Sequence, residues 1–115
     1  MRHCSDELKL NLFAGFSIKG KSHIRTKQPN QDRFLIRLLP YCEVFVVADG
    51  VGSHKFSQKG SKYICYAVQN AFKKLQKNAI VEDEILSTIY KGYKNQIRRK
   101  EKNNVGTTCL FAVIY

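Results

Sequence analysis

The sequence predicts an α+β fold in which two adjacent long helices pack on a mostly antiparallel sheet. Short apolar segments at 34–39 and 44–48, rich in Val, Ile, Leu and Phe, are typical of buried strands. Two longer segments, 57–77 and 85–97, repeat their apolar residues every three or four positions, as helices do. The segment 105–115 is again β-branched and aromatic, which indicates another strand.

The first part of the chain predicts a strand, a loop and a hairpin. Residues 12–18 alternate loosely between apolar and small side chains, and the polar stretch 19–30 contains Gly and Pro, so a strand followed by a loop is expected. The segments 34–39 and 44–48 are separated by a turn at Pro40 and therefore predict a hairpin. Because both strands are apolar on either face, we expect a second sheet behind the first.

Each predicted helix has one apolar face. In the first it consists of Ile64, Ala67, Val68, Ala71, Phe72 and Leu75, and in the second of Ile85, Leu86, Ile89, Tyr90, Tyr93 and Ile97. Carboxylates at 82–84 fit the first turn of the second helix, where they oppose the positive end of the dipole. Asn103 and Asn104 end the helical pattern.

The composition indicates one intracellular domain. The chain has 115 residues, 43% of them hydrophobic and 25% charged, which is typical of a globular protein. Charges near the start exclude a signal peptide, and no apolar run is long enough to span a membrane, so a cytoplasmic protein without membrane contact is expected. The scattered cysteines predict free thiols rather than a zinc site: Cys4, Cys42, Cys65 and Cys109.

The formal net charge of +11 could attract nucleic acid, lipid or phosphoprotein. Much of it lies at the end of the second predicted helix, where a solvated face is the first interpretation and a binding patch the second. Nucleic-acid binding is not expected, because the sequence lacks a helix-turn-helix signal, zinc-ligand spacing and exposed aromatics interleaved with arginines. The residues concerned are Lys91, Lys94, Arg98, Arg99, Lys100 and Lys102.

Two aspartates define a candidate metal site. Asp32 begins one strand of the hairpin and Asp49 ends the other, so both carboxylates should reach the same edge of the sheet. Gly50 has no Cβ to obstruct an ion and offers a carbonyl, and all-oxygen shells suit Mg or Mn better than zinc. Asp-Gly by itself is also common turn chemistry, and this is the competing interpretation.

Three ordered motifs give the site a family context. In chain order they are Gly20-Lys21-Ser22-His23 through Pro29-Asn30-Gln31-Asp32, then Val46-Val47-Ala48-Asp49-Gly50-Val51-Gly52-Ser53, then Gly106-Thr107-Thr108. Together these motifs resemble those of the type 2C (PPM-type) protein phosphatases, and of their bacterial branch in particular. The resemblance runs from about residue 13 to residue 115. It implies a partial α-β-β-α sandwich and an activity as a metal-dependent protein Ser/Thr phosphatase.

The resemblance also implies roles for individual residues. Asp32 would hold one of two Mg or Mn ions, Asp49 would bridge both, and the carbonyl of Gly50 would be a further ligand, so that a metal-activated water attacks phosphoserine or phosphothreonine. Arg25 would bind the substrate phosphate, with His23, Lys27 or Lys21 as alternatives. His54 is interpreted as a loop residue rather than an acid catalyst. The hydroxyls of Thr107 and Thr108 are expected to organise the sheet edge rather than to bind metal.

The sequence lacks the aspartates that the family supplies from two later motifs. Residues 1–115 are therefore expected to be a single, apparently truncated domain, the amino-terminal half, with doubtful activity by itself and a tendency to self-associate through an unpaired strand edge. The expected partner is a phosphorylated protein, possibly a target of a cognate Ser/Thr kinase. The alternative is a catalytically inactive phosphatase-like module that binds phosphorylated or acidic partners.

Overall fold

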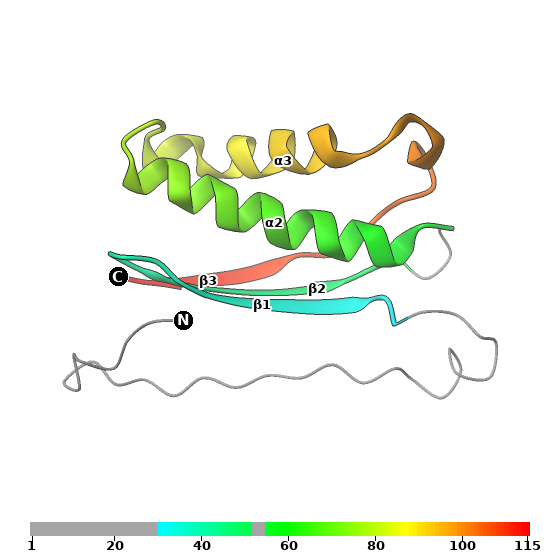
Figure 1. Ribbon diagram of the computed structural model, residues 1–115, viewed down its shortest axis with the longest axis horizontal. Helices are drawn as coiled ribbons and strands as arrows, with labels where there is room; N and C mark the ends of the chain where they lie inside the picture. Colours follow the sequence, from blue (N-terminus) through cyan, green and yellow to red (C-terminus); the bar gives the residue numbers. More distant parts are fainter. Residues whose placement is uncertain (1–29, 52–54) are drawn as a thin grey trace.

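A three-stranded antiparallel sheet carries two helices on one of its faces (Figure 1). The computed structural model describes residues 30–51 and 55–115. This arrangement confirms the α+β class, whereas the strand expected at 12–18 lies outside the described residues. In chain order the elements are β1 (Asp32–Leu38), β2 (Glu43–Asp49), α2 (Ser57–Gln76), the 3-10 turn η2 (Glu82–Glu84), α3 (Ile85–Gln96), the 3-10 turn η3 (Arg99–Glu101) and β3 (Leu110–Ile114).

The predicted hairpin forms two of the three strands of the described sheet. β1 and β2 pair antiparallel from Leu38 opposite Glu43 at the turn to Asp32 opposite Asp49 at the far end. The N–H of Leu39 donates to the carbonyl of Cys42 at 2.8 Å and closes the turn. β3 pairs with the other side of β2, so β2 is the middle strand.

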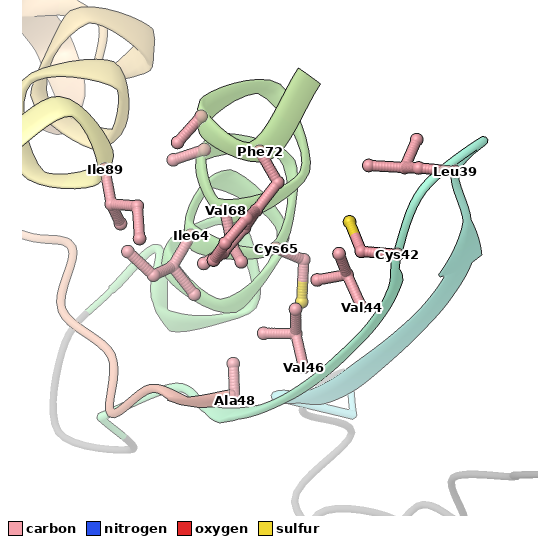
Figure 2. Packing of buried hydrophobic residues seen from close by; sticks show 12 residues of the cluster. Leu39, Cys42, Val44, Val46, Ala48, Ile64, Cys65, Val68, Phe72 and Ile89 are labelled. Carbon is pink, nitrogen blue, oxygen red and sulfur yellow. The ribbon is translucent and has the colours of Figure 1, made fainter. Parts of the chain in front are cut away.

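Burial alternates along β2, because successive side chains of a strand point to opposite faces. Val44 and Val46 face α2 and are 0% and 1% exposed, whereas Val47 on the other face is 58% exposed. Figure 2 shows the buried valines beneath the α2 residues Val68 and Phe72. Burying one such aliphatic side chain contributes roughly 1.5–3 kcal/mol, so this interface accounts for much of the stability of the described fold.

The second sheet expected behind the first is not found among the described residues, which form a single sheet. The face that would contact it carries exposed apolar side chains, among them Val47, Leu110 and Ile114. Strand residues on this face are apolar without being covered by α2 or α3 (Figure 1). Self-association through an unpaired strand edge stays a prediction.

The helices agree with the predicted periods, with small changes at their ends. α2 places its apolar stripe on the sheet, and α3 packs beside α2 and adds Ile89 to the same core. The carboxylates at 82–84 form the separate turn η2 instead of the first turn of α3, where the Glu84 side chain accepts the Val81 N–H at 3.0 Å. None of the helices within the described residues combines the length and the apolar character needed to cross a bilayer.

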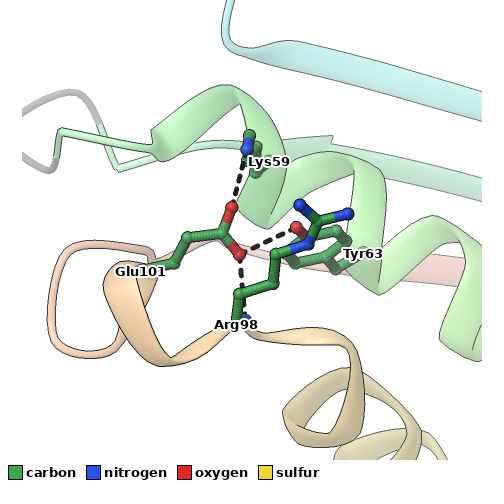
Figure 3. Close-up of polar contacts among 4 residues, drawn as sticks. All are labelled: Lys59, Tyr63, Arg98 and Glu101. Atoms are coloured by element: carbon green, nitrogen blue, oxygen red, sulfur yellow. Dashed lines mark hydrogen bonds and ion pairs between the residues drawn. The ribbon is translucent and has the colours of Figure 1, made fainter.

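A buried carboxylate fastens the connection between α3 and β3 to α2. Glu101 is 0% exposed, and its carboxylate lies 2.7 Å from the Lys59 ammonium (Figure 3). It also accepts the Tyr63 hydroxyl at 2.8 Å and the Arg98 backbone N–H at 3.0 Å. Burial by itself would raise the pKa of Glu101, but Lys59 and these hydrogen bonds outweigh it and lower the pKa to about 2.

Replacing Glu101 with Gln should destabilise the fold by about 1–3 kcal/mol, because Lys59 and Tyr63 lose their charged acceptor. The depressed pKa also fixes the sign of the pH dependence. The contribution of Glu101 is complete above its ordinary pKa of 4.5 and is lost as the pH falls toward about 2. Denaturant unfolding of both proteins between these pH values measures the effect. If the stability difference between wild type and variant did not shrink over this window, Glu101 would not be the ionised anchor.

Candidate metal centre

The two candidate metal-binding aspartates are direct neighbours across the hairpin. Asp32 is the first residue of β1, Asp49 is the last of β2, and their Cα atoms are register partners. Partners in an antiparallel pair project from the same face, with Cβ atoms about 4.5–5.5 Å apart. Both residues are exposed. Ala48, which precedes Asp49 in β2, is buried against the helices, and successive side chains of a strand point to opposite faces. Asp49 and its partner Asp32 therefore lie on the sheet face away from α2.

This pairing is electrostatically unfavourable without a cation. Like charges directly opposite each other in a sheet repel, and a divalent cation between two carboxylates reverses the sign of that interaction. The prediction that Asp32 and Asp49 reach one edge of the sheet agrees with this register. Their metal binding itself stays a prediction, since Asp32 and Asp49 are two donors and the described residues contain no group of three or more His, Cys, Asp or Glu side chains placed to hold a metal.

The backbone of Asp49 is held in place from the β3 side. Its N–H donates to Thr108 Oγ1 at 3.1 Å, and its carbonyl accepts the Thr108 N–H at 2.8 Å. Thr107 Oγ1 lies within hydrogen-bond distance of the same carbonyl, at 3.2 Å. The two hydroxyls therefore organise the edge, as expected. They lie before β3, however, which begins at Leu110 rather than at Val105, because Thr107 pairs with Gly50 as an isolated bridge.

Gly50 is required by packing as well as by any role toward an ion. A Cβ on Gly50 would lie 2.3 Å from the Ser57 carbonyl oxygen and 3.0 Å from the Gln31 carbonyl oxygen. The Gly50 N–H donates to that Gln31 carbonyl at 3.0 Å. The absent side chain thus admits the start of α2 beside the end of β2, a reason that the sequence analysis did not contain.

The second and third sequence motifs are in contact with the start of α2. The Val51 N–H donates to the Gly106 carbonyl at 3.0 Å, and the Phe56 N–H donates to the Asn104 carbonyl at 2.8 Å. A Cβ on Gly60, in the first turns of α2, would lie 2.5 Å from the Gly106 oxygen. Residues far apart in the sequence therefore form one close-packed support for Asp49. Gly60 and Ser57 were missed as supporting residues, although the resemblance already covered them.

Other candidate residues cannot be placed next to the aspartates. Arg25, its alternatives Lys21, His23 and Lys27, and also His54, lie outside the described residues. The Asp32 N–H, in contrast, has a local partner, since it donates to Asn30 Oδ1 at 3.1 Å. Asn30 therefore fixes the first turn into β1 immediately before the candidate ligand.

The described cysteines have the properties of buried or inactive thiols. Cys42, Cys65 and Cys109 are free, as expected, whereas Cys4 lies outside the described residues. Burial raises the pKa of Cys65 to about 11, with a smaller contribution from Cys109, and burial also raises the pKa of Cys42 and of Cys109. Because the thiolate is the nucleophile and the metal ligand, these cysteines are poorly suited to either role at neutral pH.

Comparisons with known proteins agree with the motifs. A family model described as "Protein phosphatase 2C" matches residues 19–115. The match includes Asp32, Asp49, Gly50 and the Gly106-Thr107-Thr108 motif. No curated protein and no solved structure matches the chain.

Proposed function

The chain belongs to the protein phosphatase 2C family, and from this we propose that its Asp32 and Asp49 form part of a divalent-metal site for hydrolysing phosphoserine and phosphothreonine in proteins. The observation that carries the proposal is the register of the hairpin, which sets these two aspartates opposite each other. Family membership by itself supports phosphatase chemistry. The substrate class and the metal dependence are the proposed part.

The donor set fits Mg²⁺ or Mn²⁺. Both side chains are carboxylates, and Gly50, which follows Asp49, would add a backbone carbonyl oxygen. Hard divalent cations prefer such oxygen donors. When bound, the metal supplies a water of lowered pKa as the nucleophile toward phosphorus.

The residues of this chain contribute positioning. Thr107 and Thr108 fix the backbone of Asp49, Gly50 is wedged between Gln31 and Ser57, and Asn30 holds the start of β1. When the backbone on both sides of a carboxylate residue is already fixed, that residue loses little conformational freedom on binding an ion, and this favours binding. We propose Arg25 as the residue that binds the substrate phosphate, through the two-point contacts that a guanidinium makes with phosphate oxygens.

A second candidate function is a phosphatase-like module that binds phosphorylated or acidic partners without turnover. The observation in its favour is that the described residues provide two neighbouring carboxylates and no larger metal-binding group. Two carboxylates hold a hydrated Mg²⁺ weakly, and a two-metal centre requires more negative charge.

Hydrolysis of a phosphothreonine peptide, with Mn²⁺ and then with excess chelator, separates the two functions. If the chain is a phosphatase, we expect phosphate release that is slow but depends on Mn²⁺ and stops on chelation. Thermal unfolding with and without Mn²⁺ gives a readout independent of turnover, since a ligand that binds the folded state raises Tm. Binding of the phosphopeptide without any Mn²⁺-dependent release would instead establish the binding module and reject the proposed activity.

A further inference from the structure

The segment between α3 and β3 presents a dense group of exposed cations. We call this group the basic connector, and it consists of Arg98, Arg99, Lys100 and Lys102. The sequence pattern predicts it at the end of a helix, but α3 ends at Gln96 and the group lies on η3 and its flanks. None of the four side chains forms an ion pair with another residue in 30–51 or 55–115. Their charge is therefore available to a partner.

The one carboxylate within this segment does not neutralise it. Glu101 is buried, and its charge is balanced by Lys59 of α2 (Figure 3). The same contacts hold η3 against α2, because the Glu101 carboxylate also bonds Tyr63 and the Arg98 backbone. The basic connector is thus anchored by a buried ion pair, while four positive charges remain at the surface.

The carboxylates nearest in sequence on the helical side lie far from the basic connector. The carboxylates of η2 are at the opposite end of α3, a helix of 12 residues that spans about 18 Å at 1.5 Å per residue. Figure 1 shows η2 and η3 at opposite ends of the helical layer. The η2 carboxylates share their end of the helical layer with Lys73, Lys74 and Lys77, whereas η3 and its flanks carry no exposed carboxylate.

η3 lies at the end of the molecule where β1 begins and β2 ends (Figure 1), and these two strand ends are Asp32 and Asp49. Thr107, which contacts the Asp49 backbone, follows Lys102 by five positions, and five residues of chain span at most about 18 Å. Lys55 adds a cation near the chain segment from Lys102 to Thr107, since the N–H of its neighbour Phe56 donates to the Asn104 carbonyl at 2.8 Å. The basic connector therefore lies within the reach of about five extended peptide residues from this backbone contact.

The chemistry around the basic connector favours an acidic protein segment over nucleic acid or a lipid surface. The Tyr63 hydroxyl is bonded to Glu101, and the Phe56 ring is partly buried with the Lys55 and Lys59 ammonium groups 5.5 and 5.4 Å from its centroid. Neither ring is a free platform for stacking bases. The neighbouring Ile97 and Val105 are partly buried, so the segment also lacks the exposed apolar face of a membrane-binding helix.

We propose that the basic connector binds acidic side chains located about five residues from the phosphorylated residue of a protein substrate. This inference rests on the proposed function, because it takes the Asp32 and Asp49 edge as the place of the phosphate. Arg99 and Lys100 are the central pair of the group, and Arg99 offers the two-point contact with carboxylates that guanidinium groups make.

The test measures binding of fluorescent phosphothreonine peptides to the full chain without metal. One peptide carries acidic residues about five positions from the phosphothreonine, on either side in separate versions, and a second carries neutral residues there. Wild type should bind the acidic peptide about tenfold more tightly at low salt, and the double variant Arg99→Glu/Lys100→Glu should lose this preference. The matched control Lys74→Glu/Lys77→Glu makes the same charge change at the far end of α2 and should retain it within about twofold.

The outcomes separate the inference from the proposed function. If both double variants lost the preference for the acidic peptide equally, the peptide would be attracted by the net charge of the protein, and a localised site would be overturned. Tighter binding of a single-stranded oligonucleotide or of anionic vesicles than of the acidic peptide would overturn the choice of partner. Because binding is measured without metal, absence of Mn²⁺-dependent hydrolysis rejects the phosphatase proposal without affecting this result. Hydrolysis combined with an unchanged preference in Arg99→Glu/Lys100→Glu rejects the inference alone.

Discussion

Replacing Asp49 with Asn should lower any Mn²⁺-dependent phosphopeptide hydrolysis by at least about 100-fold, since changes even in the outer shell of metal sites cost 10–100-fold. An amide has a single carbonyl oxygen and no charge, so it cannot link two cations as a carboxylate does. Folding should be retained, because the contacts that fix residue 49 to Thr108 use its backbone N–H and carbonyl.

Thermal unfolding provides a second measurement for Asp49→Asn. Without metal, the variant should be as stable as wild type or slightly more stable, because the repulsion between residues 32 and 49 is removed. With Mn²⁺, wild type should gain stability and the variant should gain much less. Asp83→Asn, an equal charge change on the exposed turn η2, is the matched control. A folded Asp49→Asn protein with the same Mn²⁺-induced rise in Tm as wild type would show that Asp49 is not a ligand.

Replacing Gly50 with Ala should destabilise the fold by about 3 kcal/mol, at the upper end of the range for overpacking a well-packed site. The new Cβ would lie 2.3 Å from the Ser57 carbonyl oxygen, and that atom is backbone at the start of α2. Neither partner can rotate away, so β2 or α2 must shift. Since Gly50 also pairs with Thr107, a shift here disturbs the support of Asp49.

Gly92→Ala is the matched control for Gly50→Ala. Its Cβ would meet the Ala67 Cβ at 3.5 Å, an ordinary van der Waals contact, in the middle of α3. Removing glycine from a helix interior stabilises by about 0.5–1 kcal/mol, so this variant should be slightly more stable than wild type. Denaturant unfolding of the three proteins measures both effects. Equal stability of Gly50→Ala and Gly92→Ala would contradict the tight packing at Gly50.

The local elements could be read from the sequence because their signals are local. The spacing of Ile64, Val68 and Phe72 gave the buried face of α2, and the turn at Pro40 gave the hairpin. Asp32 and Asp49 could be matched because a hairpin fixes its register from the turn outward. The family was equally accessible, since its motifs are short ordered strings of residues.

The tertiary structure decided what depends on residues distant in sequence. In the sequence Glu101 is one carboxylate among several cations, and only the approach of α2 supplies the Lys59 and Tyr63 contacts that keep its buried carboxylate ionised. In the sequence, the glycine at position 50 is explained by the space it leaves for an ion. The Ser57 carbonyl beside it gives a separate, steric reason for glycine. The late start of β3 has the same origin, since Thr107 and Thr108 bond to Asp49 before the ladder with β2 begins. Periodicity reports which face of an element is apolar, whereas these contacts arise only when separate elements pack together.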